Sequence, residues 1–252
     1  MELKSKFFDM REIKITRTPA TLIIPKTGEE EYKTIVFYHG WSSSKENQIF
    51  RGSIFALYGF QVLIPQSNYH GCRNTMGLNY EDPEVEREYL PRTIMDNIIE
   101  APEILRELVE IYNADPDNLY VSGHSMGAMT AGCLFTFSDL FKGALVFNGT
   151  LNLKPMIDEY KREASTEEVE RIHEFILQVD PINLIEKLKD RKLIMLNGTE
   201  DRDVNPEWQR EFYEKAKEVY EDKDKIVFET FPGTPHVLTT NMMEEGIKLL
   251  IK

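Results

Sequence analysis

An alternation of short apolar runs with amphipathic segments constrains the fold of this chain more than any other feature. From residue 33 onward, runs typical of buried strands alternate with segments whose apolar residues recur at helical spacing. The expected strands cover 33–40, 60–66, 118–123, 143–149, 192–198 and 225–231, and the expected helices cover 44–60, 90–112, 126–139, 206–221 and 237–252. This alternation predicts an α/β fold, with a mostly parallel sheet flanked by helices and joined by right-handed crossovers.

Two further segments refine this expectation. Residues 11–17 and 20–26 have strand character around Pro19, which predicts an antiparallel hairpin at the start of the sheet. Pro102 is expected to interrupt the long helix at 90–112, because proline removes a hydrogen bond from a helix interior.

Residues 150–187 are longer than one crossover helix requires. The stretch "STEE" at 165–168 resembles a capping box before a helix. Ligands of open α/β sheets bind outside the carboxyl ends of the strands, and an insertion after residue 149 would lie over that edge. We expect a single domain, 1–252, with a helical cap at 150–187; helices packed on the side of the domain are the alternative.

Composition and charge exclude some classes of function. The 252 residues carry a net charge of −13 with no dense block of Lys or Arg, which argues against nucleic acid or an anionic membrane as partner. The chain has no leader-like start and no long apolar span, so a cytoplasmic, non-membrane protein is expected. Cys72 and Cys133 are expected to be free, buried thiols, with a disulfide as the alternative. No CxxC or HExxH pattern predicts a metal site.

The stretch "YVSGHSMGAMTAG" at 120–132 places one serine, Ser125, between two glycines at the junction of a strand and a helix. A turn this tight forces its central residue toward strained dihedral angles, and Gly123 and Gly127 relieve the crowding two positions away. The serine oxygen would then lie at a helix N-terminus, where the amides and the helix dipole favour an anion. This pattern is the G-x-S-x-G nucleophile elbow. The alternative is that the glycines only allow a helix to pack close to the sheet.

Four motifs together resemble the α/β-hydrolase fold superfamily: "GHSMGA" around Ser125, "YHGW" at 38–41, "GTEDRDV" at 198–204 and "GTPH" at 233–236. The stretch "FYHGWSSSKEN" is similar to small bacterial esterases near the dienelactone-hydrolase and prolyl-oligopeptidase-like branches. The resemblance covers roughly residues 33–252. It implies a catalytic triad in the order nucleophile, acid, histidine.

That order leaves one of the five histidines as the general base. His236 follows the last expected strand, in a turn that contains Pro232, Gly233 and Pro235. The other four are assigned elsewhere: His39 to the oxyanion region, His70 to a loop, His124 beside the serine, and His173 to a solvated helix face. A surface histidine that caps the last helix is the alternative for His236.

The acid and the oxyanion donors also follow from the resemblance. Gly198, Asp201 and Val204 match the family pattern G-x-x-D-x-x-V, so Asp201 is the expected acid, with Asp203 as the alternative. The oxyanion hole would use the backbone N–H groups of Met126 and Trp41. The Trp41 ring could line the acyl pocket, belong to the core, or do both.

The resemblance implies a serine hydrolase, first of all a carboxylesterase, that cleaves a small-molecule ester through an acyl-enzyme without cofactor or metal. A peptidase or aminoacyl hydrolase, a thioesterase, a perhydrolase and a non-catalytic ligand-binding protein are the alternatives. Apolar residues of the expected cap would suit a modest acyl or alcohol group, or would form the cap's own core: Met156, Ile157, Tyr160, Phe175 and Ile176. The oligomeric state stays open, a homodimer included.

Overall fold

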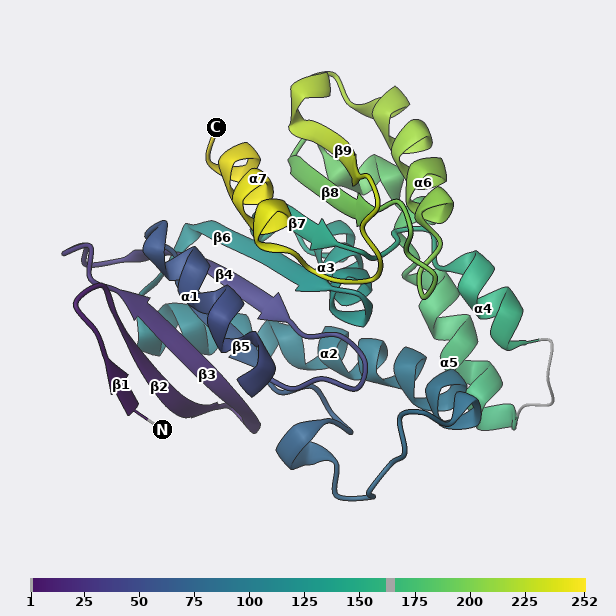
Figure 1. The fold of residues 1–252 in the computed structure, drawn as a ribbon, viewed down its shortest axis with the longest axis horizontal. Coiled ribbons are helices and arrows are strands. Elements are labelled where there is room, and N and C mark those ends of the chain that lie inside the picture. Colours follow the sequence, from purple (N-terminus) through teal and green to yellow (C-terminus); the bar gives the residue numbers. More distant parts are fainter. Residues whose placement is uncertain (1, 162–165) are drawn as a thin grey trace.

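The described residues of this computed structural model, 2–161 and 166–252, form one nine-stranded sheet covered by helices on both faces (Figure 1). The strands are β1 (Glu2–Lys4), β2 (Phe8–Ile15), β3 (Thr18–Pro25), β4 (Tyr32–Tyr38), β5 (Gln61–Pro65), β6 (Ala114–His124), β7 (Phe141–Phe147), β8 (Lys192–Gly198) and β9 (Ile226–Phe231). The helices are α1 (Ile49–Leu57), α2 (Pro83–Tyr112), α3 (Met126–Phe137), α4 (Lys154–Tyr160), α5 (Glu167–Gln178), α6 (Pro206–Val219) and α7 (Thr240–Ile251). The predicted α/β fold class is confirmed.

The strand order is β1-β2-β3-β5-β4-β6-β7-β8-β9. All pairs from β5–β4 to β8–β9 are parallel, whereas β1, β2 and β3 join the sheet in antiparallel fashion. The hairpin predicted around Pro19 is therefore confirmed, with its turn at Thr16, whose φ is 51°. The edge strand β1 is an addition that the sequence patterns did not predict.

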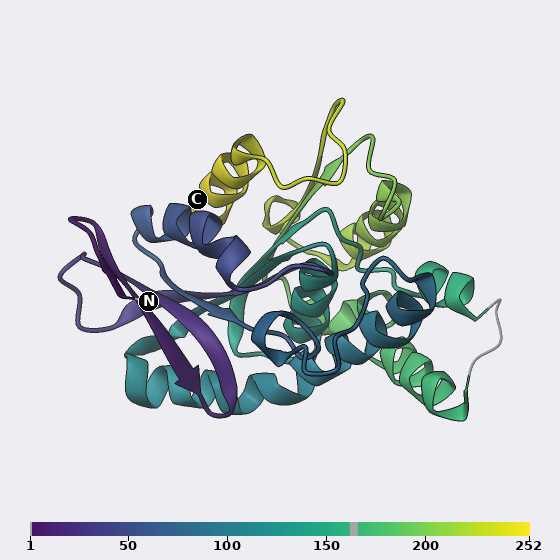
Figure 2. The same ribbon diagram turned by 60° about the horizontal axis from the view of Figure 1, so that its bottom comes forward.

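Two apolar layers hold the helices on the sheet. One layer packs α1 and α7 against it through residues such as Phe55 and Met242. The other packs α2, α3 and α6 through residues such as Ile94, Phe135 and Phe212. Figure 2 shows α1 and α7 on the side of the sheet opposite to α2. Because both faces are covered, β5 is buried along its whole length and β7 is buried from Gly143 onward, which explains why these stretches are apolar.

The long helix α2 differs from its prediction in two respects, where it begins and whether Pro102 interrupts it. It begins at Pro83, where the Asp82 side chain accepts a hydrogen bond from the N–H of Glu84. It then runs unbroken to Tyr112 with Pro91 and Pro102 inside, so the expected interruption at Pro102 is wrong. Packing against the sheet and α3 outweighs the hydrogen bonds that the prolines remove.

The prediction of a solvated His173 is also wrong, because this α5 residue is buried against α2. Pro91 has no N–H, so the carbonyl of Arg87, four residues earlier, loses its normal helical donor. The His173 Nε2 atom lies 3.3 Å from that carbonyl oxygen and takes the place of the missing donor. The polar ring is therefore buried where the helix backbone needs a partner.

Residues 150–187 contain α4, α5 and two short 3-10 helices, η3 (Pro181–Asn183) and η4 (Ile185–Leu188). The N-cap of α5 is Thr166, whose side chain accepts from the N–H of Val169. The predicted capping box began at Ser165, which lies outside the described residues. The helix therefore starts one position later than that pattern implies.

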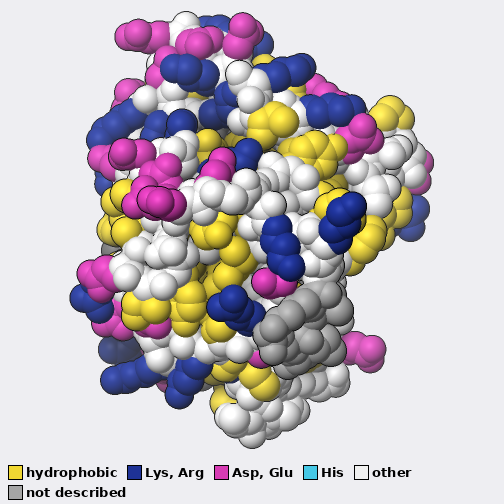
Figure 3. All heavy atoms as spheres, turned by 90° about the vertical axis from the view of Figure 1, so that its left-hand side faces the viewer, with side chains coloured by type: hydrophobic (Ala, Val, Ile, Leu, Met, Phe, Trp, Pro, Cys, Tyr) yellow, Lys and Arg dark blue, Asp and Glu magenta, His cyan; other side chains and the backbone are white. Residues whose placement is uncertain are grey.

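The surface and the cysteines complete the description. Cys133 is buried but Cys72 is exposed, so only one of the two expected buried thiols is buried, and both are free. On the face over the N-terminal strands, Lys and Arg side chains are mixed with Asp, Glu and apolar side chains (Figure 3). Within the described ranges, no helix is both long and apolar enough to cross a lipid bilayer.

Candidate active site

Ser125 occupies a strained turn between β6 and α3. Its φ and ψ are 58° and −124°, outside the regions that side chains favour. A Cβ on Gly127 would overlap the carbonyl of Tyr38, and a Cβ on Gly123 would overlap the backbone of Gly127. The two glycines are therefore required by close backbone approach, as the elbow pattern predicted.

Asp201 and His236, the expected acid and base, form a pair at the carboxyl ends of β8 and β9. The Nδ1 atom of His236 lies 2.7 Å from Oδ2 of Asp201, whose side chain is fully shielded from solvent. The other oxygen, Oδ1, accepts the backbone N–H groups of Asp203 (3.0 Å) and Val204 (2.9 Å). These bonds fix the carboxylate with one oxygen toward the ring. The exposed Asp203 side chain does not take this position.

The loops that carry the acid and the histidine pack directly on each other. A Cβ on Gly198 would overlap the carbonyl of Thr234, so the first position of the G-x-x-D-x-x-V pattern requires glycine. The N–H of Glu200 donates to that same Thr234 carbonyl at 3.0 Å. The loop after β8 and the turn after β9 are thereby held in a fixed position relative to each other.

Ser125 and His236 line one cavity of about 470 Å³. Its remaining lining residues come from the loop after β4 and from α2, α3, α4, the acid loop and α6: Trp41, Ser42, Glu86, Leu90, Met129, Met156, Glu159, Tyr160, Asp203, Val204 and Trp208. Among the described residues, no hydrogen bond joins the Ser125 hydroxyl to the His236 ring. Such bonds commonly tighten only when substrate is bound.

The expected oxyanion donors, Met126 and Trp41, belong to two segments that contact the Ser125 turn. Met126 is the first residue of α3, so its N–H has no acceptor within the helix. The segment before Trp41 packs on the nucleophile, since a Cβ on Gly40 would lie 3.3 Å from the Ser125 Cβ. The Trp41 ring lines the cavity, packs on the core and donates Nε1–H to the Tyr80 carbonyl at 3.2 Å. The ring is therefore shared between the core and the cavity wall, and its role in an acyl pocket stays a prediction.

Three other histidines surround this site and are held neutral. Burial lowers the pKa of His39 to about 3, and its Nε2 accepts from the Ser67 N–H at 3.2 Å. Burial likewise lowers the pKa of His70 to about 4. Burial, with repulsion from His236 and Arg51, lowers the pKa of His124 to about 3. None of the three is charged near neutral pH.

The sequence motifs did not predict that several carboxylates line the cavity. Glu86 of α2, Glu159 of α4 and Asp203 of the acid loop all line it. Burial raises the pKa of Glu86, which accepts a hydrogen bond from the Tyr160 hydroxyl at 3.1 Å. The Asp82-Pro83 pair marks the true start of α2 and could have revealed that Glu86 belongs to a helix.

The apolar residues expected in the cap divide between two environments. Met156 and Tyr160 of α4 line the cavity. Ile157 and Ile176 are fully buried in the core, and Phe175 packs against that core without lining the cavity. Of the two helices α4 and α5, it is therefore α4 whose side chains line the cavity around Ser125.

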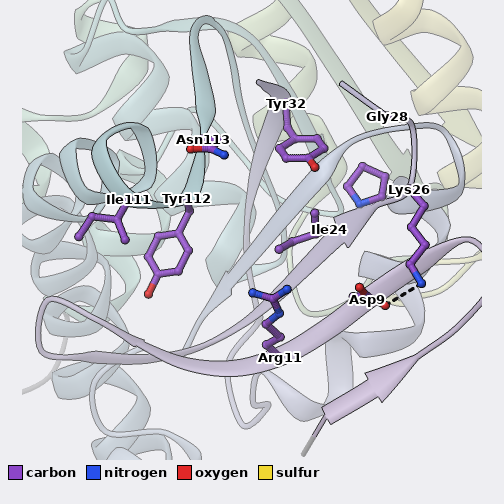
Figure 4. A pocket seen from close by; sticks show the side chains of 10 residues that line it. Asp9, Arg11, Ile24, Lys26, Gly28, Tyr32, Ile111, Tyr112 and Asn113 are labelled. Atoms are coloured by element: carbon purple, nitrogen blue, oxygen red, sulfur yellow. Dashed lines mark ion pairs between the residues drawn. The ribbon is translucent and has the colours of Figure 1, made fainter. Parts of the chain in front are cut away.

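A second hollow, of about 590 Å³, lies between β2, β3 and the end of α2 (Figure 4). It is lined by the residues at which β4 begins and α2 ends, Tyr32 and Tyr112, and so lies at the amino ends of the parallel strands. An ion pair between Asp9 and Lys26, at 2.9 Å, lies on its wall. It contains no member of the Ser125 site, which occupies the opposite ends of the strands.

Known proteins resemble this chain over most of its length. Protein YitV of Bacillus subtilis (strain 168) is 25% identical over 202 residues, which cover 75% of this chain and 76% of YitV. Esterase YjfP of Escherichia coli (strain K12) is 24% identical over 221 residues, which cover 84% of this chain and 86% of YjfP. The crystal structure of TT1662 from Thermus thermophilus matches with a TM-score of 0.78 at 21% identity and covers 97% of both chains.

The sequence profile of the Prolyl oligopeptidase family matches residues 58–249, a range that includes the elbow, the acid loop and the histidine turn. The resemblance inferred from the motifs is thus confirmed. Because the match spans well over half of the sequence, the chain belongs to the prolyl oligopeptidase family of serine hydrolases.

Proposed function

We propose that this protein hydrolyses small carboxylic esters through an acyl-enzyme formed on Ser125. The observation that carries the proposal is the cavity in which Ser125 lies beside His236, whose Nδ1 is 2.7 Å from the shielded Asp201 carboxylate. In this mechanism the Ser125 hydroxyl attacks the ester carbonyl while His236 Nε2 accepts its proton. Asp201 holds the ring in the required tautomer and stabilises the imidazolium.

The negative charge that develops on the carbonyl oxygen requires preorganised donors. The N–H of Met126, at the start of α3, and the N–H of Trp41, which follows the Gly40 that packs on Ser125, are proposed to supply them. His236 then protonates the leaving alkoxide, and a water molecule repeats the sequence on the acyl-enzyme. All proton transfers therefore pass through one ring.

The acyl or alcohol group would lie under α4. Leu90, Met129, Met156 and Val204 give the cavity an apolar wall that suits a short chain. We accordingly propose that α4 acts as the cap over the site, whereas α5 anchors the same insertion on α2.

The test combines covalent labelling with substitution. A fluorophosphonate probe should label the parent protein at Ser125, and Ser125→Ala should lose both the label and ester turnover, by about 10⁴-fold or more. Ser42→Gly is the matched control, because Ser42 lines the same cavity and its φ of 54° suits glycine. Near-parental turnover by purified Ser125→Ala would exclude the mechanism.

The carboxylates favour a second candidate, the hydrolysis of aminoacyl esters or amides. In the described ranges the ion pairs involve other residues, so Glu86, Glu159 and Asp203 have no Lys or Arg partner. A substrate ammonium group could pair with them inside the cavity that Ser125 also lines.

Alanine and phenylalanine p-nitrophenyl esters, each with a free or acetylated amine, distinguish this candidate. Preference for the free amine should fall about 10- to 100-fold in Glu86→Gln if Glu86 binds the ammonium group. Glu84→Gln is the control, because Glu84 is exposed on the first turn of the same helix. Equal rates on free and acetylated substrates would leave the simple esterase as the function.

A further inference from the structure

We propose that Asn148 is a positioning residue of the triad, whose single side-chain amide holds the histidine loop and the acid loop to the end of β7. The inference rests on the proposed function, since Asn148 would act through His236 and Asp201. Nothing in the serine, acid and histidine motifs includes this residue.

The amide of Asn148 uses its two ends on two different loops. Its Nδ2–H donates to the carbonyl of Val237, the residue after His236, at 2.8 Å. Its Oδ1 accepts the N–H of Gly198, three residues before Asp201, at 2.8 Å. Both partners are backbone groups, so the orientation of the amide is fixed by their chemistry. The residue is completely buried, which makes each bond costly to lose.

The backbone of Ser125 is hydrogen-bonded to the residue next to Asn148. The N–H of Ser125 donates to the carbonyl of Phe147, the last residue of β7, at 3.0 Å. The backbone N–H of Asn148 itself donates to the Leu196 carbonyl of β8 at 2.9 Å. The segments that carry the serine, the acid and the histidine therefore meet at Phe147 and Asn148, although they are far apart in sequence.

The amide also contacts the ring beneath the proposed base. Nδ2 of Asn148 lies 3.4 Å from Nε2 of His124, whose ring centroid is 5.0 Å from that of His236. Since burial lowers the pKa of His124 to about 3, this ring stays neutral. It can accept from Asn148, and it adds no positive charge beside a His236 imidazolium.

Asparagine suits the position for a backbone reason as well. The φ of Asn148 is 46°, in the left-handed region that asparagine tolerates better than most residues. Aspartate would have a similar shape but would present an oxygen to the Val237 carbonyl. Glycine would tolerate the backbone angle but would remove both loop contacts.

The test compares Asn148→Asp and Asn148→Gly with Asn197→Ala. Asn197 is the matched control: it is an equally buried amide in β8, and its Nδ2 donates to the Gly149 carbonyl at 2.9 Å rather than to the histidine loop. The measurements are kcat and KM on a p-nitrophenyl ester, the Tm, and the downfield proton NMR signal of the His236 Nδ1–H in its bond to Asp201.

Both Asn148 variants should lower kcat by about 10- to 100-fold, because a displacement of about 1 Å at a reacting group costs on that order. KM should change little, and the downfield proton signal should weaken or disappear. Asn197→Ala should lower the Tm but keep kcat within a few-fold and retain the signal. This combination would separate positioning from a merely structural role.

A folded Asn148 variant with parental kcat and an intact proton signal would overturn the proposal. If Asn148→Asp does not fold, Asn148→Gly decides by the same criteria, since glycine adopts the observed φ without strain. Fluorophosphonate labelling of the parent keeps the two proposals apart. An unlabelled Ser125 overturns both, whereas a labelled parent with unaffected Asn148 variants overturns only the role of Asn148.

Discussion

At the scale of single residues, two carboxylates two positions apart have different environments. Asp201 is shielded and directs one oxygen to His236, while the N–H groups of Asp203 and Val204 occupy the other. The Asp203 side chain is exposed at the cavity wall. The backbone of the loop therefore places the Asp201 carboxylate, and not that of Asp203, against the His236 ring.

Asp201→Asn should lower kcat by about 10⁴-fold, because an amide would favour the wrong tautomer of His236. Asp203→Asn should stay within several-fold of the parent on a neutral ester, since its side chain does not contact the ring. Steady-state rates of the two purified variants check this ranking. The reverse order would mean that the acid had been assigned to the wrong position of the loop.

Motif spacing could predict that Ser125, Asp201 and His236 lie together, because local backbone constraints such as the glycines of the elbow leave a pattern in the sequence. It could not predict Asn148, whose contacts come from segments that meet only in the folded sheet. The burial of His173 could not be predicted for a similar reason. The charged residues of α5 predict that His173 is exposed to solvent, but its ring is buried against a backbone carbonyl of α2.

At the scale of elements, the insertion at 150–187 contributes differently through its two helices. Met156 of α4 lines the cavity, whereas Ile157, the next residue, points into the core. Helical periodicity could predict an amphipathic helix here. It could not decide which neighbour its apolar face would meet, because that depends on where α2 and α6 lie.

Met156→Ala should shift the preferred acyl chain length by several-fold in kcat/KM, because one methylene in an apolar pocket is worth roughly 1–3 kcal/mol. Ile157→Ala should instead cost roughly 2–5 kcal/mol of stability and leave the length profile unchanged. A series of p-nitrophenyl esters and thermal unfolding measure the two effects. An unchanged profile in Met156→Ala would place the acyl group elsewhere in the cavity.

The contact between α5 and α2 should show energetic coupling. His173→Leu leaves the buried Arg87 carbonyl without this donor and should cost about 1–3 kcal/mol. Pro91→Ala restores a backbone N–H for that carbonyl, so it should reduce the cost of His173→Leu. A double-mutant cycle in urea measures the coupling. Strictly additive effects would contradict the exchange of one donor for the other.

At the scale of the whole molecule, the fold follows from its strand and helix alternation, but its ionisation does not. Three of the five histidines, His39, His70 and His124, have pKa values lowered to between about 3 and 4. Sequence alone assigns all of them the same ordinary value. Burial by segments distant in the chain creates the difference.

Acid should therefore destabilise the protein before its carboxylates titrate. Each lowered histidine pKa means that the unfolded chain binds more protons, so this stability is present above about pH 6.5 and lost as pH falls. Asp180, whose pKa burial raises to about 6, opposes part of the effect. The Tm should fall by roughly 10 °C between pH 7 and 5, at a few degrees per kcal/mol.

His70→Phe is the variant that isolates this contribution, because it removes one of the neutral rings. Between about pH 5 and 6 the dependence of its unfolding free energy on pH should be shallower than that of the parent by close to one proton, and the two slopes should converge above about pH 7. Denaturant unfolding at several pH values between 5 and 8 gives the slope. A slope identical to that of the parent would mean that His70 is not neutral in the folded state.

The position of β9 has a consequence for how the protein fails on heating. In the described part of the chain this strand is an edge of the sheet and pairs with β8 alone, and the proposed base lies in the turn that follows it. Edge segments open locally at lower free energy than the core. Heat inactivation should then begin with a reversible detachment of one margin of the sheet, while most of the chain remains native. The temperature at which activity is lost would then depend on the free energy of local opening at the β9 edge rather than on the free energy of global unfolding.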